Sequence, residues 1–278
     1  MKKIILGALF FTALNTFAQQ GNAIVLKKGE KISVTTTNSS DADVMGMQMK
    51  NNFENTSIIE VDGENANDYS ITSTLLKLKL SLDGMGQSQS FDSENEADQK
   101  NPEMKKMFSD AIGKKTSISL NKFTGIPVVN KAASPEKPED DAMEGLMTSF
   151  GSEDPTVNGA FLVIPAGKKA GDSWTVKDST KENKNVITYT IDSLMGNIAK
   201  ISMQAERSGV NNVEGGGESV DMAMTIKSSG NITADKQNGL VSERSTTSDI
   251  SGSMEVQGQT IPVSGTTTMT SRYTTVKQ

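Results

Sequence analysis

The stretch Leu76-Lys77-Leu78-Lys79-Leu80-Ser81-Leu82 alternates apolar and polar side chains without a break. Successive side chains of a β-strand point to opposite faces, so a period of two predicts a strand with one apolar and one solvated face. Residues 220–226 repeat the pattern, with Met222 and Met224 at apolar positions. Strands of this kind are typical of antiparallel sheets that have one face in water.

Similar alternation predicts further strands throughout the chain. They lie at residues 32–34, 45–49, 56–61, 116–120, 173–176, 186–191, 198–205, 251–256 and 261–273. Turn sequences such as Asp83-Gly84 and Asn238-Gly239 separate them at short intervals, which indicates hairpins and meanders. We therefore predict a mainly β fold (β-rich α+β), in which antiparallel meander strands form a curved sheet or a sandwich. Residues 211–219, with three consecutive glycines, predict a flexible loop.

Two short helices are predicted in the middle of the chain. Asn101 can cap a helix that begins at Pro102 and carries apolar side chains on one face up to residue 112. A similar spacing from about residue 140 to 150 predicts the second helix. Residues 130–141, rich in Pro, Lys and Glu, predict an exposed linker between the two.

The first eighteen residues have the composition of a secretory signal peptide. Lys2 and Lys3 precede an apolar run at residues 4–14, and Ala18 offers a cleavage site. We therefore expect an exported protein, either periplasmic or extracellular. Residues 19–278 then form a single β-rich domain, with a first half at about 22–129, a helical and linker insert at about 100–151, and a second half at about 160–276.

The two halves begin alike. Lys28-Gly29-Glu30 precedes the first predicted strand, and Ala170-Gly171-Asp172 precedes its counterpart in the second half. This likeness is expected from an internal duplication into two related halves, and it is also expected from low-complexity composition alone.

Two residue types with wide chemical use are missing. The chain has no cysteine and no histidine, which excludes disulfides, thiolate nucleophiles, His-assisted catalysis and the commonest metal ligands. We therefore predict a protein that is not an enzyme and needs no cofactor. A glycan hydrolase that uses two carboxylates is the alternative, because its chemistry needs neither residue.

The charge and hydropathy of the chain limit its partners. The net charge is −6, and removal of Lys2 and Lys3 makes the mature chain more acidic. An acidic chain with no basic stripe is not expected to bind nucleic acid. The mature chain has no apolar run of transmembrane length. The expected partners are thus an apolar small molecule or an envelope protein, and the oligomeric state is open.

Methionine is frequent, with 15 residues against a single Trp. Met47, Leu78, Met222 and Met224 lie on the apolar faces of predicted strands, and flexible thioether side chains adapt to irregular apolar partners. We predict that these residues and Trp174 contact an apolar, lipid-like ligand or a partner protein. The alternative is that they only fill a core, as in a purely structural or adhesive surface protein.

Four acidic residues occupy alternate positions after the strongest strand. Asp92, Glu94, Glu96 and Asp98 offer carboxylate oxygens with the spacing of a calcium loop. The run lacks the glycine and the final glutamate that complete a helix-loop-helix calcium motif. It predicts either a Ca²⁺ site or a solvated acidic loop.

Short motifs flank several predicted strands. They are Lys28-Gly29-Glu30, Phe91-Asp92-Ser93, and Gly171-Asp172-Ser173-Trp174 after Pro165. Together with the signal peptide and the Thr/Ser-rich C-terminal part, they resemble a family of exported Bacteroidota proteins, the domain of unknown function 6263. The resemblance covers nearly the whole mature chain, and it implies an envelope setting and no catalytic residues.

Overall fold

The computed structural model describes eight segments of the chain. They are residues 23–44, 46–84, 87–100, 112–129, 155–179, 183–215, 218–256 and 259–277. Strands make up nearly all of their regular structure, which confirms the predicted mainly β fold. The predicted signal peptide, the linker at 130–141, the second predicted helix, and the first predicted helix up to residue 111 lie outside the described residues.

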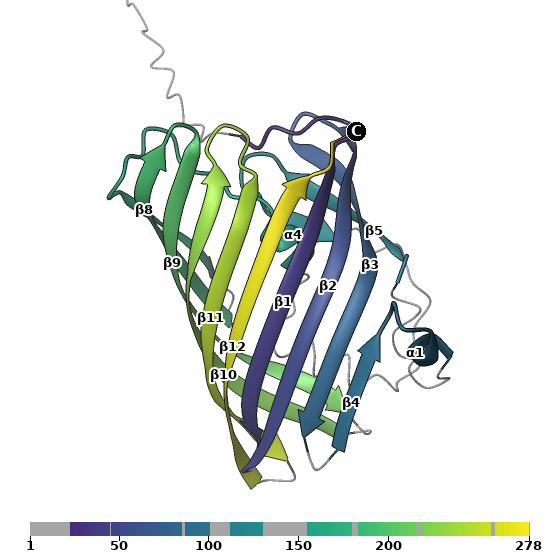
Figure 1. The fold of residues 1–278 in the computed structure, drawn as a ribbon. Helices are drawn as coiled ribbons and strands as arrows, with labels where there is room; N and C mark the ends of the chain where they lie inside the picture. Colours follow the sequence, from purple (N-terminus) through teal and green to yellow (C-terminus); the bar gives the residue numbers. More distant parts are fainter. Residues whose placement is uncertain are drawn as a thin grey trace, which may run out of the picture.

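One antiparallel sheet of 12 strands runs through the described residues (Figure 1). Its strands are β1 (Lys31–Val44), β2 (Met47–Glu64), β3 (Asp68–Gly84), β4 (Gln87–Asp92), β5 (Lys115–Asn121), β6 (Pro127–Val129), β7 (Ser173–Ser179), β8 (Asn183–Met195), β9 (Ile198–Gly215), β10 (Glu218–Asp235), β11 (Val241–Val256) and β12 (Gln259–Thr275). The short helices α1 (Glu96–Lys100) and α4 (Pro155–Asn158) accompany it. In this part of the chain, no helix is long and apolar enough to cross a membrane.

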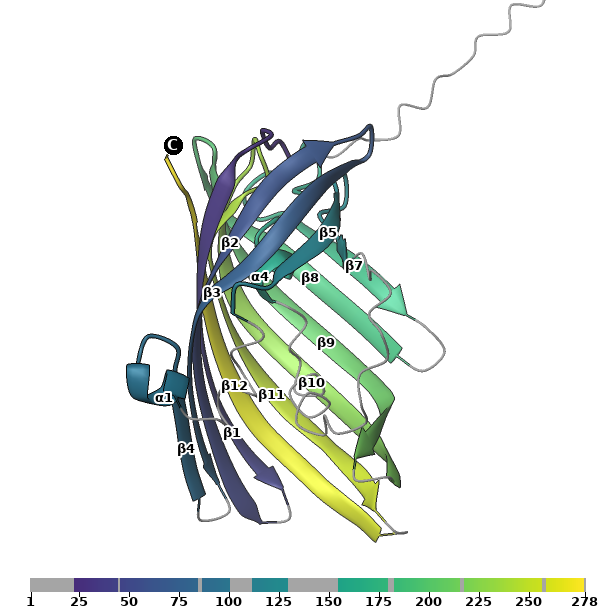
Figure 2. The ribbon, with the colours of Figure 1, turned by 90° about the vertical axis from the view of Figure 1, so that its right-hand side faces the viewer.

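The strand order shows where the sheet begins and ends. It is β6-β5-β3-β2-β1-β12-β11-β10-β9-β8-β7, with β4 paired to β3 beside this path. The first strand therefore pairs with the last, from Ile32 opposite Thr275 to Val44 opposite Val263. The two edges, β6 and β7, come from the middle of the sequence. Figure 2 shows that this single sheet curves strongly around a concave side, so the structure is a curved sheet and not a sandwich.

Three glycines lie where neighbouring backbones of the curved sheet come close. A Cβ atom at Gly230 would lie 2.3 Å from the carbonyl oxygen of Ser245, and one at Gly252 would lie 2.3 Å from that of Ala223. At Gly265 the corresponding distance to the Asp41 carbonyl oxygen is 2.8 Å. Only glycine fits at such separations, and glycines inside strands are a known means of bending a sheet.

Two sequence predictions were wrong at hairpins. The predicted loop at 211–219 is strand on both sides, because β9 continues to Gly215 and β10 begins at Glu218. Pairing along the whole length of both strands outweighs the low strand propensity of glycine. The predicted strand at 45–49 contains a turn, where Gly46 has φ +77° and its N–H donates to Asp43 Oδ1 at 2.8 Å.

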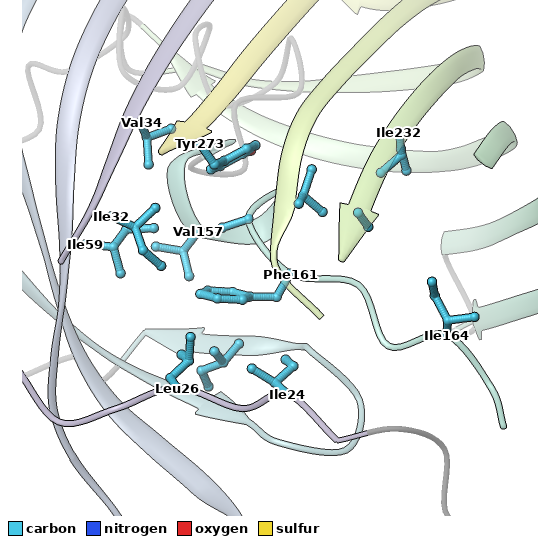
Figure 3. Close-up of a cluster of buried hydrophobic side chains, with 14 of the residues drawn as sticks. Ile24, Leu26, Ile32, Val34, Ile59, Val157, Phe161, Ile164, Ile232 and Tyr273 are labelled. Atoms are coloured by element: carbon cyan, nitrogen blue, oxygen red, sulfur yellow. The ribbon is translucent and has the colours of Figure 1, made fainter. Parts of the chain in front are cut away.

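The main hydrophobic core fills one end of the concave side. Figure 3 shows Val157 and Phe161 between Ile32 and Ile59 of the sheet and Leu26 of the N-terminal segment. The segment after α4 is held to the sheet by the backbone, since Val241 N–H donates to Ala160 C=O at 2.9 Å. We refer to residues 157–164 as the plug, because they close this end of the curved sheet.

Candidate ligand-binding face

The concave face of the sheet is divided into three tiers. Directly opposed residues in antiparallel strands share a face, so the register defines rows of side chains across the sheet. The upper tier is the core around the plug. Below it lies a polar tier, and below that an apolar tier rich in methionine. The polar tier comprises Thr36, Asn55, Ser228, Arg244, Thr246, Ser248 and Ser271.

Paired hydroxyl groups occupy the centre of the polar tier. Thr36 Oγ1 and Ser271 Oγ lie 2.9 Å apart, and both residues are fully buried. Ser228 Oγ and Ser248 Oγ form a second pair at 2.8 Å. Within each pair one hydroxyl donates to the other, so neither oxygen is without a hydrogen-bond partner.

Other polar atoms of the tier are buried without a partner. Among the described residues these are Asn55 Oδ1, Arg244 Nε and Thr246 Oγ1, and a further one, Asn51 Oδ1, lies four residues before Asn55 on β2, outside the tier. Asn55 is 6% exposed and Thr246 is 9% exposed. Buried polar atoms of folded proteins nearly always have a hydrogen-bond partner, and each exception needs an explanation. The tier therefore has unused hydrogen-bonding capacity directed at the concave side.

Arg244 reaches sideways across the sheet. It lies on β11, and its Nη2 donates to Met203 Sδ of β9 at 3.2 Å. The side chain thus crosses β10 next to Gly230, which lies between Thr246 and Met203 in the same row. Tyr189 is the neighbour of Met203 on β8. Burial raises the pKa of Tyr189, while the positive charge of Arg244 lowers the same pKa to a smaller extent.

The lower tier forms a second hydrophobic cluster, separate from the main core. We call it the methionine tier, and it consists of Met222, Met224, Ile226, Ile250 and Met254. The first two methionines and Ile250 are buried, and the other two residues are partly buried. All five side chains lie on β10 and β11, in consecutive rows of the same face. An apolar surface is therefore present on the concave side beyond the polar tier.

The structure brings only some of the predicted ligand-binding residues together. Met222 and Met224 are neighbours in the methionine tier. Leu78 is buried on β3, which is separated from the central strand β12 by β2 and β1. Met47, at the start of β2, is 38% exposed. Trp174 lies on β7, where its ring stacks on Tyr189 with centroids 5.0 Å apart. These residues therefore belong to different rows of the concave face.

Sequence reasoning missed the polar residues of the concave face. Arg244, Thr246 and Ser248 precede Ile250 at intervals of two, so they share its face. Their polarity made the stretch look solvent-facing. The signal in the sequence is the even spacing from Ile250, because residues two, four and six positions before it lie on the same face of a strand and place Arg244 on the concave side.

The acidic run is used for local structure. Asp92 Oδ1 accepts the N–H of Glu94, and Asp98 Oδ2 accepts the N–H of Asp92, both at 2.9 Å. Three of the carboxylates also pair with lysines: Asp92 with Lys79, Glu94 with Lys77, and Glu96 with Lys100. Among the described residues, no group of three or more acidic side chains is arranged to hold a metal ion. These contacts give the calcium hypothesis no support.

The depressions formed by described residues are open to solvent. The larger has a volume of about 490 Å³ and lies over β8 to β11. It is lined mainly by side chains of the outer face, such as Lys184, Val210 and Thr225, and it reaches the backbone at Gly209 and Gly252. The bend at the concave-face glycines thus produces hollows on the outside of the sheet.

Sequence comparison assigns the chain to a family. The profile of a family of unknown function, DUF6263, matches residues 66–241, from β3 to the first residue of β11. The chain belongs to the DUF6263 family. The match confirms the resemblance to DUF6263 over residues 66–241, which include Phe91-Asp92-Ser93 and Gly171-Asp172-Ser173-Trp174 and leave out Lys28-Gly29-Glu30. No curated protein matches the sequence.

Solved structures match the chain at low sequence identity, and one of those described below shares its fold. A structure titled "Lipid-protein interactions in lipovitellin" matches 91% of this chain with a TM-score of 0.52 and 9% identity. The match covers 26% of that protein, so the DUF6263 chain corresponds to about a quarter of it. The match to an outer membrane channel from Pseudomonas putida F1 covers 92% of this chain and 98% of that chain, with 10% identity and a TM-score of 0.26. The match to Pseudomonas aeruginosa OccK5 (OpdH) covers 92% of this chain and 100% of that chain, with 7% identity and a TM-score of 0.23.

Proposed function

We propose that this DUF6263 protein is an exported, non-enzymatic envelope protein of Bacteroidota that binds an apolar, lipid-like ligand on the concave face of its sheet. The observation that carries the proposal is the methionine tier, an apolar cluster on the concave side that is separate from the core around the plug.

The chemistry of the tier suits a flexible apolar ligand. Met222, Met224 and Met254 have unbranched, polarizable side chains that adapt to different shapes. Ligand sites are typically concave and apolar, with a few polar groups that fix the ligand's orientation. The methionine tier supplies the apolar part, and the polar tier above it supplies the polar groups.

Lipovitellin supports the proposal by analogy of fold. Its structure is described in terms of lipid–protein interactions, and the part of it that matches this chain has a comparable sheet. Because one fold serves many functions, the likeness adds weight only beside the site itself. The signal peptide predicted at residues 1–18 supports a periplasmic or extracellular location. The alternative occupant of the concave face is a partner protein that inserts an apolar segment.

The test is native mass spectrometry of the mature protein, purified gently from its own envelope. We expect a bound acyl lipid, which solvent extraction releases for analysis. Met224→Asp places a charge in the methionine tier and abolishes the bound mass. Ala223→Asp places the same charge one residue earlier, on the exposed outer face, and retains it. Circular dichroism verifies that both variants fold. A bare polypeptide mass for the wild type, with no uptake of added lipid, contradicts the proposal.

A further inference from the structure

Arg244 is a partly buried cation on the concave face of the sheet, with no counter-ion among the described residues. Its neighbours across the strands are Ser271 and Ile232, neither of which carries a charge. Its Nη2 contacts only the weak acceptor Met203 Sδ, and its Nε is buried without an acceptor. The guanidinium carries a positive charge.

Gly230 lies beside the path of the Arg244 side chain across β10. In this row Thr246, Gly230 and Met203 follow one another across β11, β10 and β9. Glycine has no side chain, and the Arg244 side chain passes over this position to reach Met203. A Cβ atom at Gly230 would approach Thr246 Oγ1 to 3.1 Å. The unpaired hydroxyl of Thr246 therefore lies close to Gly230, in the row next to Arg244.

Tyr189 completes the surroundings of the guanidinium. Its phenol is buried next to Met203, at 7% exposure. Met203, which accepts from Arg244 Nη2 at 3.2 Å, is the direct cross-strand neighbour of Tyr189, so the two groups flank the same methionine. The ring is held by stacking on Trp174. Arg244, Thr246 and Tyr189 thus present one charged and two hydroxyl groups to a small region of the concave face.

These groups have the chemistry of an anion site. A buried charge without a partner is costly, and an anion with several oxygens relieves that cost by charge-assisted hydrogen bonds. Arginine suits carboxylate and phosphate groups, because its planar fork matches their geometry. The hydroxyls of Thr246 and Tyr189 can donate to the same oxygens.

The anion site lies in line with the methionine tier. Thr246 and Ile250 are four residues apart on β11 and point to the same face, which corresponds to about 13 Å at the rise of an antiparallel strand. A ligand that places an anionic group at Arg244 can therefore extend an apolar chain along β10 and β11 to Ile250 and Met224.

We propose that Arg244, with Thr246 and Tyr189, binds the anionic headgroup of a long-chain amphiphile whose tail lies on the methionine tier. This inference rests on the proposed function and specifies its ligand: a molecule with a carboxylate or phosphate at one end and a long apolar chain. Arg244 fixes the headgroup, and the methionine tier accommodates chains of different shape.

The experiment compares three probes on the full mature chain after removal of bound lipid. Sodium oleate carries both charge and chain, oleyl alcohol carries the chain alone, and acetate and inorganic phosphate carry the charge alone. The single tryptophan, Trp174, reports binding by fluorescence because it stacks on Tyr189. We expect oleate to bind at least about tenfold more tightly than oleyl alcohol, as one charge-assisted hydrogen bond would give. We expect no binding of acetate or phosphate at the same concentration.

Arg244→Met removes the charge and keeps an unbranched apolar side chain. It should weaken oleate binding about tenfold or more and leave oleyl alcohol binding unchanged. Arg272→Met is the matched control, because Arg272 is exposed on the outer face of β12, where it pairs with Glu243 at 3.7 Å. This control should change neither probe.

The possible outcomes separate the two proposals. Equal binding of oleate and oleyl alcohol overturns the anion site and leaves the apolar ligand site intact. This comparison needs only the wild type, so it remains decisive if Arg244→Met fails to fold. Binding of acetate or phosphate as tightly as oleate overturns the amphiphile in favour of a free anion. If neither oleate nor oleyl alcohol binds, the proposed function and the inference both fail.

Discussion

Tyr189 is the residue whose titration reports directly on the concave face. Burial raises its pKa above the usual 10.0, and the Arg244 charge works in the opposite direction. A raised folded-state pKa means that the folded protein holds the phenolic proton more tightly than the unfolded chain does. The associated stability is therefore complete below pH 10 and is lost as the pH rises through the raised value.

Alkaline titration followed by tyrosinate absorbance tests this property. The chain has three tyrosines, and Tyr189→Phe should remove a transition that occurs above pH 10. Arg244→Met should move that transition to still higher pH, because the cation that favours the phenolate is gone. Loss of an ordinary transition near pH 10 in Tyr189→Phe would show that the phenol is not desolvated.

Gly230 illustrates a constraint on the backbone at a single residue. Its added Cβ would lie 2.3 Å from Ser245 C=O, so Gly230→Ala must push β10 and β11 apart. We expect a loss of about 1–3 kcal/mol in the free energy of unfolding, as for other overpacked sites. Gly63→Ala is the control, because a Cβ there meets nothing within 4 Å. Urea denaturation of both variants measures the difference, and similar losses would mean that the contact at Gly230 is not the cause.

At the scale of elements, the junction of β1 and β12 depends on a buried hydroxyl pair. Thr36 and Ser271 lie opposite each other and are both inaccessible to solvent. Thr36→Val or Ser271→Ala alone leaves one buried hydroxyl unpaired, at a cost of about 1–3 kcal/mol. The double variant should lose less than the sum of the two, because neither polar group then remains. A double-mutant cycle by urea denaturation measures this coupling, and strict additivity would exclude it.

The plug is the element that completes the upper core. Phe161 is 5% exposed and packs with the sheet residues around Ile59. Phe161→Ala should lower the free energy of unfolding by about 3–5 kcal/mol, through lost burial and the cavity that remains. Phe123, which is 41% exposed in the turn between β5 and β6, provides the comparison. Phe123→Ala should change stability by about 0.5 kcal/mol or less, and an equal loss in the two variants would contradict the structural role of the plug.

Alternation of apolar with polar residues located most of the strands correctly. Where both faces of a strand are polar, the sequence did not show which residues face the concave side. The Leu78 to Leu82 pattern predicted β3, and the Met222 to Ile226 pattern predicted β10. The strands extend well beyond those patterns. In the polar tier, the concave positions of several strands are occupied by Ser, Thr and Asn. Such residues carry no hydrophobic signal, so sequence periodicity could not extend the strands or place Arg244 on the inner face.

At the scale of the whole molecule, the sheet is an antiparallel meander whose two edge strands come from the middle of the sequence. The first and last strands, β1 and β12, pair with each other, while β6 and β7 remain as edges. Turn signals predicted that successive strands pair as hairpins. The pairing of β1 with β12 joins residues more than two hundred positions apart, and no local pattern encodes such a contact.

This closure predicts how the chain responds to truncation. β12 lies at the centre of the sheet, with β1 on one side and β11 on the other. Deletion of residues 259–278 would expose the full lengths of both neighbours as unpaired edges and would uncover Ile32 and Val34 of the core. We expect a product without a cooperative urea transition that elutes as aggregates in size-exclusion chromatography. Deletion of residues 276–278 alone removes one backbone hydrogen bond, from Val276 N–H to Lys31 C=O, and should leave a monodisperse, cooperatively unfolding protein. If the longer deletion also unfolds cooperatively, the two halves are stable without their junction, and the central role of the β1–β12 pair is wrong.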